Sequence, residues 1–207
     1  MVKVKICGLS RDCDIDAVNE LKPDYIGLVF APSRRRVTPG QAAWLRMRLS
    51  PDIIPVGIFV NEPIDNIISL VNDGIIDIIQ LHGDENEDYI RQLKKRTDKP
   101  VIKAVAVHNK NDALKWSDSV ADYLLLDNII AGSGETFDWD LIGEISKPFF
   151  LAGGLCPENV ARAIAKTKPF AVDTSSGVET SGFKDKAKIK DFVIRARNAK
   201  ICQEDIK

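Results

Sequence analysis

Short runs of apolar and β-branched residues recur along the whole chain, and stretches with helical spacing separate them. Most of the runs lack a strict alternation of apolar and polar residues, which is typical of strands buried on both faces of a parallel sheet. Strands are therefore predicted at residues 2–6, 25–30, 54–60, 76–81, 101–107, 123–127, 149–154 and 170–175.

Helix start and stop signals flank the stretches between these runs. Pro39 follows the capping residue Thr38, for example, and Gly74 follows a predicted helix end. Eight strand–helix units in one chain favour a closed (β/α)8 barrel, a TIM barrel, over an open doubly wound sheet. The predicted helices cover residues 10–21, 39–49, 63–73, 86–96, 110–117, 138–145, 157–167 and 184–199.

The length of the chain predicts one domain. Its 207 residues fall below the about 250 that are typical of such barrels, so the loops must be short and no lid domain fits. We expect a single barrel domain over residues 1–207, in which residues 199–207 form a C-terminal tail that extends or frays from the last helix.

Composition and charge are ordinary for a soluble globular protein. The chain is 44% hydrophobic and 29% charged, and its formal net charge of −1 gives no reason to expect nucleic acid or an anionic membrane as a partner. No apolar stretch reaches membrane-spanning length, and the N-terminus enters a strand pattern directly. We expect a cytoplasmic protein. The oligomeric state stays open.

The cysteines do not indicate a metal site or a disulfide framework. Cys7, Cys13, Cys156 and Cys202 lack CxxC spacing, and the chain has only two histidines. Reduced thiols without a bound metal are therefore expected.

In a barrel of this type the chemistry gathers at the C-terminal ends of the strands. Cys7 ends the first predicted strand and Asp127 ends the sixth. Alone, the cysteine is more often a packing residue, and the aspartate can cap the next loop. Together at one barrel mouth they suggest an acid–base pair.

The loops after the last two strands predict a phosphate site. Glycines allow a ligand to approach the backbone closely, and serines add hydroxyl and amide donors. Either loop alone could be a plain turn, but phosphate binding after the seventh and eighth strands recurs among barrels. The four candidates are Gly153, Gly154, Ser175 and Ser176.

Three further polar residues follow predicted strands. Arg35 lies in the run "SRRRV" at 33–37, which is either a solvated loop or a fork for a carboxylate. His82 either hydrogen-bonds within its own loop, which is the simpler interpretation, or contacts a substrate. Asp173 either caps the following turn or holds a substrate hydroxyl.

Eight motifs, taken in chain order, resemble the phosphoribosylanthranilate isomerase family of tryptophan biosynthesis. The resemblance extends from residue 2 to about residue 197, and its specificity comes from the order of the motifs. The motifs are "VKICGLS", "GLVFAPSRRRVTP", "VGIFVN", "IIQLHGDE", "LLLDN", "GSGETFDW", "LAGGLCPENV" and "VDTSSGVE…GFKD".

The resemblance implies a small barrel without metal or organic cofactor. It would convert N-(5-phosphoribosyl)anthranilate to 1-(2-carboxyphenylamino)-1-deoxyribulose 5-phosphate by an Amadori rearrangement. Cys7 would be the general base, Asp127 the general acid and Arg35 the carboxylate-binding arginine. Asp173 matches a substrate-contacting aspartate. The phosphate loops fall on Gly153, Gly154, Ser175 and Ser176.

The chain departs from the family pattern at three places. Its arginine loop is one residue shorter than is common and has three consecutive arginines, so Arg36 is a second candidate for the carboxylate. Asn128 follows Asp127 where serine or threonine is common. Cys156 stands where a helix-capping residue is often found.

The reaction makes two demands on these residues. Opening the furanosyl ring requires Asp127 in its protonated form when substrate is bound. Removing a proton from C2 of the sugar requires Cys7 as a thiolate. A free thiol has a pKa of about 8.5, so we expect a positive local field to lower the pKa of Cys7.

Other interpretations remain. A related barrel isomerase of histidine biosynthesis, or a dual-substrate enzyme, would carry an aspartate where this chain has Cys7. An indole-forming synthase could use Lys103 but would need a longer N-terminal extension. A non-catalytic phosphate-ligand sensor would bind its ligand and release it unchanged. Neither Lys103 nor His108 is assigned a role.

Overall fold

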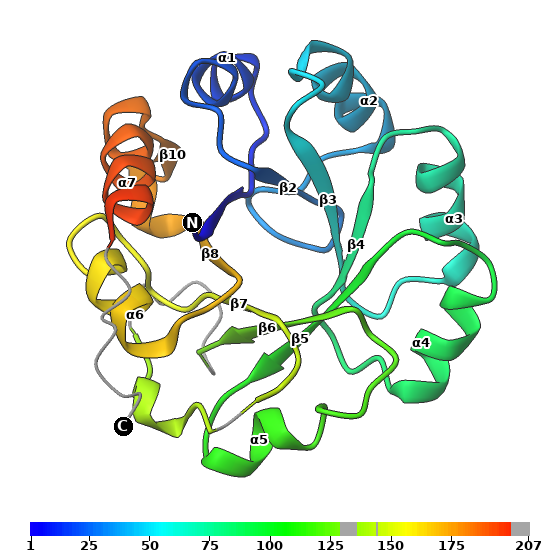
Figure 1. Cartoon of the computed structure of the whole chain (residues 1–207). Helices are drawn as coiled ribbons and strands as arrows, with labels where there is room; N and C mark the ends of the chain where they lie inside the picture. Colours follow the sequence, from blue (N-terminus) through cyan, green and yellow to red (C-terminus); the bar gives the residue numbers. More distant parts are fainter. Residues whose placement is uncertain (129–135, 144, 200–207) are drawn as a thin grey trace.

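The computed structural model describes residues 1–128, 136–143 and 145–199. Eight parallel strands pair in chain order from β1 to β8, and β8 pairs with β1 to close a barrel (Figure 1). The predicted TIM barrel is confirmed. The strands are β1 (Lys3–Cys7), β2 (Tyr25–Val29), β3 (Ile54–Phe59), β4 (Ile78–Leu81), β5 (Val101–Ala106), β6 (Tyr123–Asp127), β7 (Phe149–Leu151) and β8 (Ala171–Thr174).

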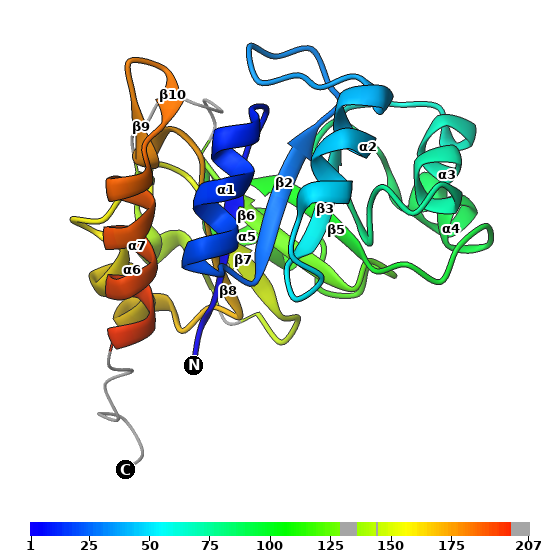
Figure 2. The same ribbon diagram turned by 90° about the horizontal axis from the view of Figure 1, so that it is seen from above.

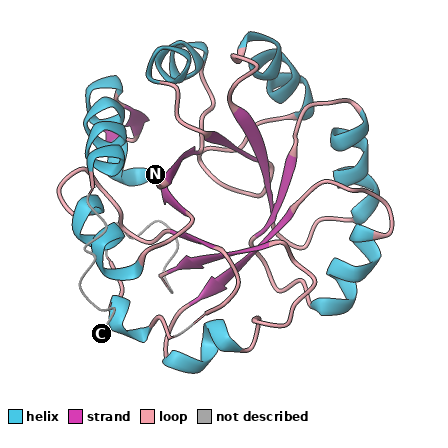
Figure 3. Ribbon diagram, viewed as in Figure 1, coloured by secondary structure: helices cyan, strands magenta, loops and turns pink. Residues whose placement is uncertain are grey.

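The helices form a ring outside the strands, so the barrel wall is covered by apolar helix faces (Figure 3). No helix in the described ranges combines the length and apolarity needed to cross a bilayer. The helices are α1 (Asp12–Leu21), α2 (Pro39–Arg48), α3 (Ile64–Asn72), α4 (Glu87–Lys94), α5 (Lys110–Leu114), α6 (Val160–Thr167) and α7 (Lys186–Asn198).

Local details differ from the sequence prediction at several places. The predicted helix 138–145 is only a 3-10 turn, η1 (Trp139–Leu141), in its described part. Helix α6 begins at Val160 rather than at 157. A second 3-10 turn, η2 (Ser176–Val178), and a two-stranded hairpin of β9 (Glu179–Thr180) and β10 (Phe183–Lys184) follow β8 and were not predicted. Apart from residue 199, the predicted tail lies outside the described residues.

Alternate strand residues build two separate cores. One set packs between the strands and the helices and includes Val4 and Ile6 of β1. The other set lies inside the barrel and includes Tyr25, Phe150 and Ala171. Because successive side chains of a strand point to opposite faces, Lys5 and Cys7 face the barrel interior when Val4 and Ile6 face the helices.

The loops that follow the strands gather at one end of the barrel. Figure 2 shows the loop between β2 and α2 and the β9–β10 hairpin rising at this end, opposite the N-terminus. This end is the C-terminal rim of the barrel, where the ends of β1 and β6 place Cys7 and Asp127.

Phe150 is the clearest test of the interior core. Its ring is 0% exposed and makes edge-on contacts with Tyr25, Tyr123 and Phe170. We expect Phe150→Ala to lower the free energy of unfolding by about 3–5 kcal/mol, because it leaves a cavity that this aromatic cluster cannot fill. Phe183→Ala is the matched control: Phe183 is 58% exposed, so its loss should cost less than about 1 kcal/mol. Denaturant unfolding measures both, and equal losses would contradict this account of the core.

Candidate active site

Cys7 lies at the rim, at the end of β1, and the residue as a whole is half-buried. The next residue, Gly8, has a positive φ of 79°. A Cβ at this position would lie 2.4 Å from Cδ of Arg35, so the glycine is required for the arginine to cross the backbone here. Arg35 therefore lies directly over the residue that follows the candidate base.

Below Cys7, the barrel holds a buried ion pair. Lys5 Nζ donates to Asp173 Oδ1 at 3.0 Å, and the register of β1 and β8 pairs the same two residues. Lys5 also interacts electrostatically with the Cys7 side chain, which lies two residues further along β1. Burial by itself would lower the pKa of Lys5, but the charges of Asp173 and Cys7 outweigh it and raise the pKa, so Lys5 is a cation.

The expected lowering of the Cys7 pKa is not what the structure has. Burial of the thiol raises its pKa, and the nearby cations Lys5 and Lys184 offset this only in part. Asp173 acts in the same direction as burial, because its negative charge disfavours a thiolate. The sequence argument allowed for a positive field but not for the cost of desolvating the sulfur.

Each oxygen of the Asp127 carboxyl group has one polar neighbour. Oδ1 accepts a hydrogen bond from the Asn128 amide at 2.7 Å, and Oδ2 lies 3.5 Å from His82 Nε2. Gln80 Nε2 lies 2.9 Å from His82 Nδ1. With the amide donating to Nδ1, the ring hydrogen is on Nε2 and is directed at Asp127. His82 thus contacts the candidate acid rather than only its own loop.

Asp173 connects the two halves of this arrangement. It bonds Lys5 beside Cys7, and it also interacts electrostatically with Asp127 and His82. Burial raises the pKa of Asp173, although the charge of Lys5 opposes this effect. The thiol and the carboxyl group proposed from the sequence therefore lie at the same rim, and Asp173 interacts electrostatically with both.

The loops after β7 and β8 contact each other. Gly153 and Gly154 both have positive φ, of 78° and 64°. Thr174 Oγ1 donates to the carbonyl of Leu155 at 2.6 Å and ties the two loops to each other. A Cβ at Gly177 would lie 2.0 Å from the same carbonyl oxygen, so η2 packs against the β7 loop with no space for a side chain.

Ser175 and Ser176 belong to the second of these loops. Ser175 Oγ donates to the Cys7 carbonyl at 3.0 Å and receives a hydrogen bond from Lys184 Nζ at 3.2 Å. This contact links the β8 loop to the end of β1. Ser176 begins η2.

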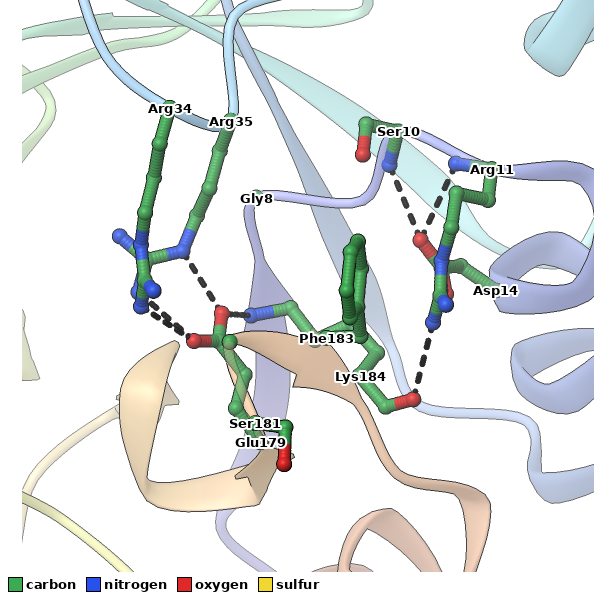
Figure 4. Close-up of a pocket in the computed structure, with 11 residues that line it drawn as sticks. Gly8, Ser10, Arg11, Asp14, Arg34, Arg35, Glu179, Ser181, Phe183 and Lys184 are labelled. Atoms are coloured by element: carbon green, nitrogen blue, oxygen red, sulfur yellow. Dashed lines mark hydrogen bonds and ion pairs between the residues drawn. The ribbon is translucent and has the colours of Figure 1, made fainter.

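A cluster of cations surrounds one carboxylate beside Cys7 (Figure 4). The side chain of Glu179 is 5% exposed. Its carboxylate accepts hydrogen bonds from Nε of Arg35 at 2.7 Å, Nη2 of Arg34 at 2.6 Å and Nζ of Lys184 at 2.6 Å. Burial alone would raise the pKa of Glu179, but these hydrogen bonds from Arg35 and Lys184 lower it. The cluster lines a pocket of about 210 Å³ that Phe183 and the start of α1 complete.

The other residues considered from the sequence lie elsewhere. Arg36 is exposed and lines a different pocket with Phe59 and Glu62. Lys103 is held by Glu85 at 2.9 Å and by the Gly83 carbonyl at 2.6 Å, away from the barrel axis. His108 is exposed near the same segment. Most of the "GSGETFDW" motif lies outside the described residues.

Four residues of the site were missed by the sequence reasoning. Lys5 and Gln80 interrupt otherwise apolar strands, and a polar residue on the inward face of a barrel strand was the available signal. Glu179 and Lys184 lie in a hairpin of two-residue strands that is too short for any periodicity. In the part of the chain that the structure describes, no three His, Cys, Asp or Glu side chains gather to hold a metal ion.

A thiol and a carboxyl group lie at one rim of a closed barrel, beside glycine- and serine-rich loops, which is where (β/α)8-barrel enzymes carry their active sites. The family model described as N-(5'phosphoribosyl)anthranilate (PRA) isomerase matches residues 4–195. The chain belongs to this isomerase family, as its motifs indicated.

Individual relatives agree with the family model. An N-(5'-phosphoribosyl)anthranilate isomerase of Endomicrobium trichonymphae is 49% identical over 197 residues, which cover 93% of this chain and 97% of that protein. The crystal structure of phosphoribosyl anthranilate isomerase from Thermotoga maritima is 38% identical, has a TM-score of 0.86, and is matched over 95% of this chain and 99% of that chain.

One solved relative carries a ligand. It is a phosphoribosyl anthranilate isomerase in complex with reduced 1-(o-carboxyphenylamino)-1-deoxyribulose 5-phosphate. It is 38% identical with a TM-score of 0.84, and the match covers 95% of this chain and 99% of that chain.

Gly177 tests the packing of the two loops. We expect Gly177→Ala to lower the free energy of unfolding by about 1–3 kcal/mol, because its Cβ would collide with the Leu155 backbone rather than with a movable side chain. Gly40→Ala is the control, since a Cβ at Gly40 meets nothing within 4 Å and alanine favours the α2 helix by up to about 1 kcal/mol. Denaturant unfolding compares the two, and a Gly177→Ala protein as stable as the wild type would refute the tight packing.

Proposed function

We propose that this chain isomerises N-(5'-phosphoribosyl)anthranilate to 1-(2-carboxyphenylamino)-1-deoxyribulose 5-phosphate, with Asp127 as general acid and Cys7 as general base. The observation that supports the residue roles is the presence of both groups at one rim, where each interacts electrostatically with Asp173. Family membership supports the reaction, and the ligand in the solved relative is a reduced form of this product.

Asp127 begins the reaction by giving a proton to the furanose ring oxygen. The C1–O bond breaks as the anilino nitrogen supplies its electron pair to C1, which forms a protonated Schiff base. The carboxylate that remains on Asp127 faces His82 Nε2 at 3.5 Å and the Asn128 amide at 2.7 Å. Both are donors that suit the charged form of the acid.

Cys7 then removes the proton from C2 of the opened sugar. The electron pair of the C2–H bond forms the C1–C2 double bond of an enolamine, and the Schiff-base nitrogen becomes neutral. Tautomerisation adds a proton at C1 and leaves a ketone at C2, which is the product. Positioned acids and bases of this kind typically contribute about 10²–10⁴-fold each.

The two ends of the substrate are held apart on either side of this chemistry. Gly153, Gly154, Ser175 and Ser176 receive the phosphate, and Arg35 receives the anthranilate carboxylate. Glu179 engages only the Nε and Nη2 edge of Arg35, so the guanidinium is fixed in place and its Nη1 edge remains for the ligand. His82 and Asp173 are assigned to the sugar between the two anchors.

Variants of the acid and the base test the assignment. We expect Cys7→Ala and Asp127→Asn each to lower kcat at least about 10²-fold, with little change in the affinity for a reduced product analogue. The assay follows loss of anthranilate fluorescence with freshly made phosphoribosylanthranilate. Near wild-type turnover in either variant would remove that residue from the mechanism. A wild-type protein that binds the substrate and releases it unchanged would be a sensor and not an isomerase.

Neighbouring arginines test the carboxylate anchor. Because Arg35 lies over Gly8 beside Cys7 and Arg36 faces another pocket, Arg35→Ala should raise KM at least about tenfold. This corresponds to about 1.4 kcal/mol of lost charge-assisted hydrogen bonding. Arg36→Ala is the matched control and should change KM less than about twofold. The reverse order would show that Arg36 holds the carboxylate. Steady-state kinetics of the same fluorescence assay separate these outcomes.

A further inference from the structure

The reaction as derived makes no use of Lys5. Among the described residues, Lys5 is nevertheless the most deeply buried charged residue. Its side chain is 0% exposed, and an ammonium group is costly to bury unless other groups compensate it. An apolar residue of similar size would fill the same space at no such cost. Packing alone therefore does not explain why a lysine occupies this position.

Lys5 is placed to act on the sulfur. It precedes Cys7 by two residues on β1, so both side chains point to the barrel interior on the same side of the strand. Its Nζ bonds Asp173 Oδ1 at 3.0 Å, and its charge favours the Cys7 thiolate. One ammonium thus lies on the same side of β1 as the candidate base and pairs with a carboxylate on the neighbouring strand β8.

We propose that Lys5 is a positioning residue of the isomerase: its buried ammonium is the counter-cation that allows Cys7 to exist as a thiolate, and Asp173 holds that ammonium in place. This inference rests on the proposed function, because it assigns Lys5 to the general base of that reaction. Lys5 itself stays outside the contact with substrate.

The other charges near the sulfur leave this task to Lys5. Among the described residues, the charged groups with the largest effects on Cys7 are Lys5 of β1, Asp173 of β8 and Lys184 of β10. Lys184 is held against the Glu179 carboxylate at 2.6 Å, and burial lowers its pKa. Asp173 is an anion and opposes a thiolate, while Asp127 and His82 act on Asp173. Lys5 is therefore the cation with the largest effect on the thiol among these groups.

The pairing with Asp173 explains how the ammonium can stay buried throughout turnover. When Cys7 is a thiolate, Lys5 faces two anions. After Cys7 has taken the C2 proton, Asp173 still neutralises Lys5, so no unpaired charge is left inside the barrel. No group has to move between the two states, which keeps the reorganisation cost of proton transfer low.

Alkylation of Cys7 tests the inference without substrate. Cys13, Cys156 and Cys202 are first replaced by serine, so that Cys7 is the only thiol. The rate of reaction with iodoacetamide is then measured from pH 6 to pH 10, which gives the pKa of Cys7 directly because only the thiolate reacts. We expect Lys5→Met to raise this pKa by at least about one unit, seen as an alkylation rate about tenfold lower near pH 7.5.

Lys103→Met is the matched control. It also removes a buried lysine from a carboxylate pair at 2.9 Å, but on β5 and away from the sulfur. It should leave the alkylation profile within about twofold of the parent. If Lys5→Met does not fold because Asp173 is left unpaired, the double variant Lys5→Met with Asp173→Asn replaces it. It is compared with Asp173→Asn alone, because Asp173 itself disfavours the thiolate, and the Cys7 pKa is expected to be higher in the double variant than in Asp173→Asn.

An unchanged alkylation profile in a folded variant without Lys5 would overturn the inference, even if the wild-type protein is an active isomerase. Equal shifts in the Lys5 and Lys103 variants would do the same, because they would report a general loss of packing. Conversely, absence of isomerase turnover in the wild type would refute the proposed function while leaving the alkylation result intact. In an active protein, Lys5→Met should lower kcat most at low pH, with little change in KM.

Discussion

The cost of placing charge inside a closed barrel governs the site. Closure and the two-residue repeat of each strand oblige some side chains near the rim to point inward, where they lose most of their hydration. Lys5 and Asp173 meet this constraint by pairing across β1 and β8 at 3.0 Å. Cys7 lies against the same pair, so the chemistry of the thiol depends on how completely these two charges compensate each other.

The charges of the cluster around Glu179, near the rim, do not balance. Glu179 is nearly buried but meets Arg34, Arg35 and Lys184, so the cluster contains more cations than anions. Such an excess suits a ligand that carries a carboxylate and a phosphate, because the positive field attracts it and survives in a poorly hydrated site. Inside the barrel the charges balance, whereas near the rim they leave a positive surplus for the ligand.

The sequence predicted the barrel because eight apolar runs need only their spacing to be recognised, and strand ends such as Cys7 and Asp127 follow from that spacing. It missed the partners that tertiary contact creates. Glu179 lies about 144 positions from Arg35 along the chain, so no local pattern connects them. The predicted lowering of the Cys7 pKa was wrong for a related reason. The sequence indicated neighbouring cations, but it did not show that the sulfur would be buried.

A thiol whose pKa is raised by burial is still a suitable base for this reaction. Raising the pKa makes the thiolate a stronger proton acceptor but lowers its population, and the best compromise has a pKa near the working pH. Burial alone would carry the thiol past that compromise, since a free thiol already has a pKa of about 8.5. A cation that opposes desolvation without removing it is what such a base requires. Lys5 supplies this opposition from inside the barrel, where solvent cannot screen it.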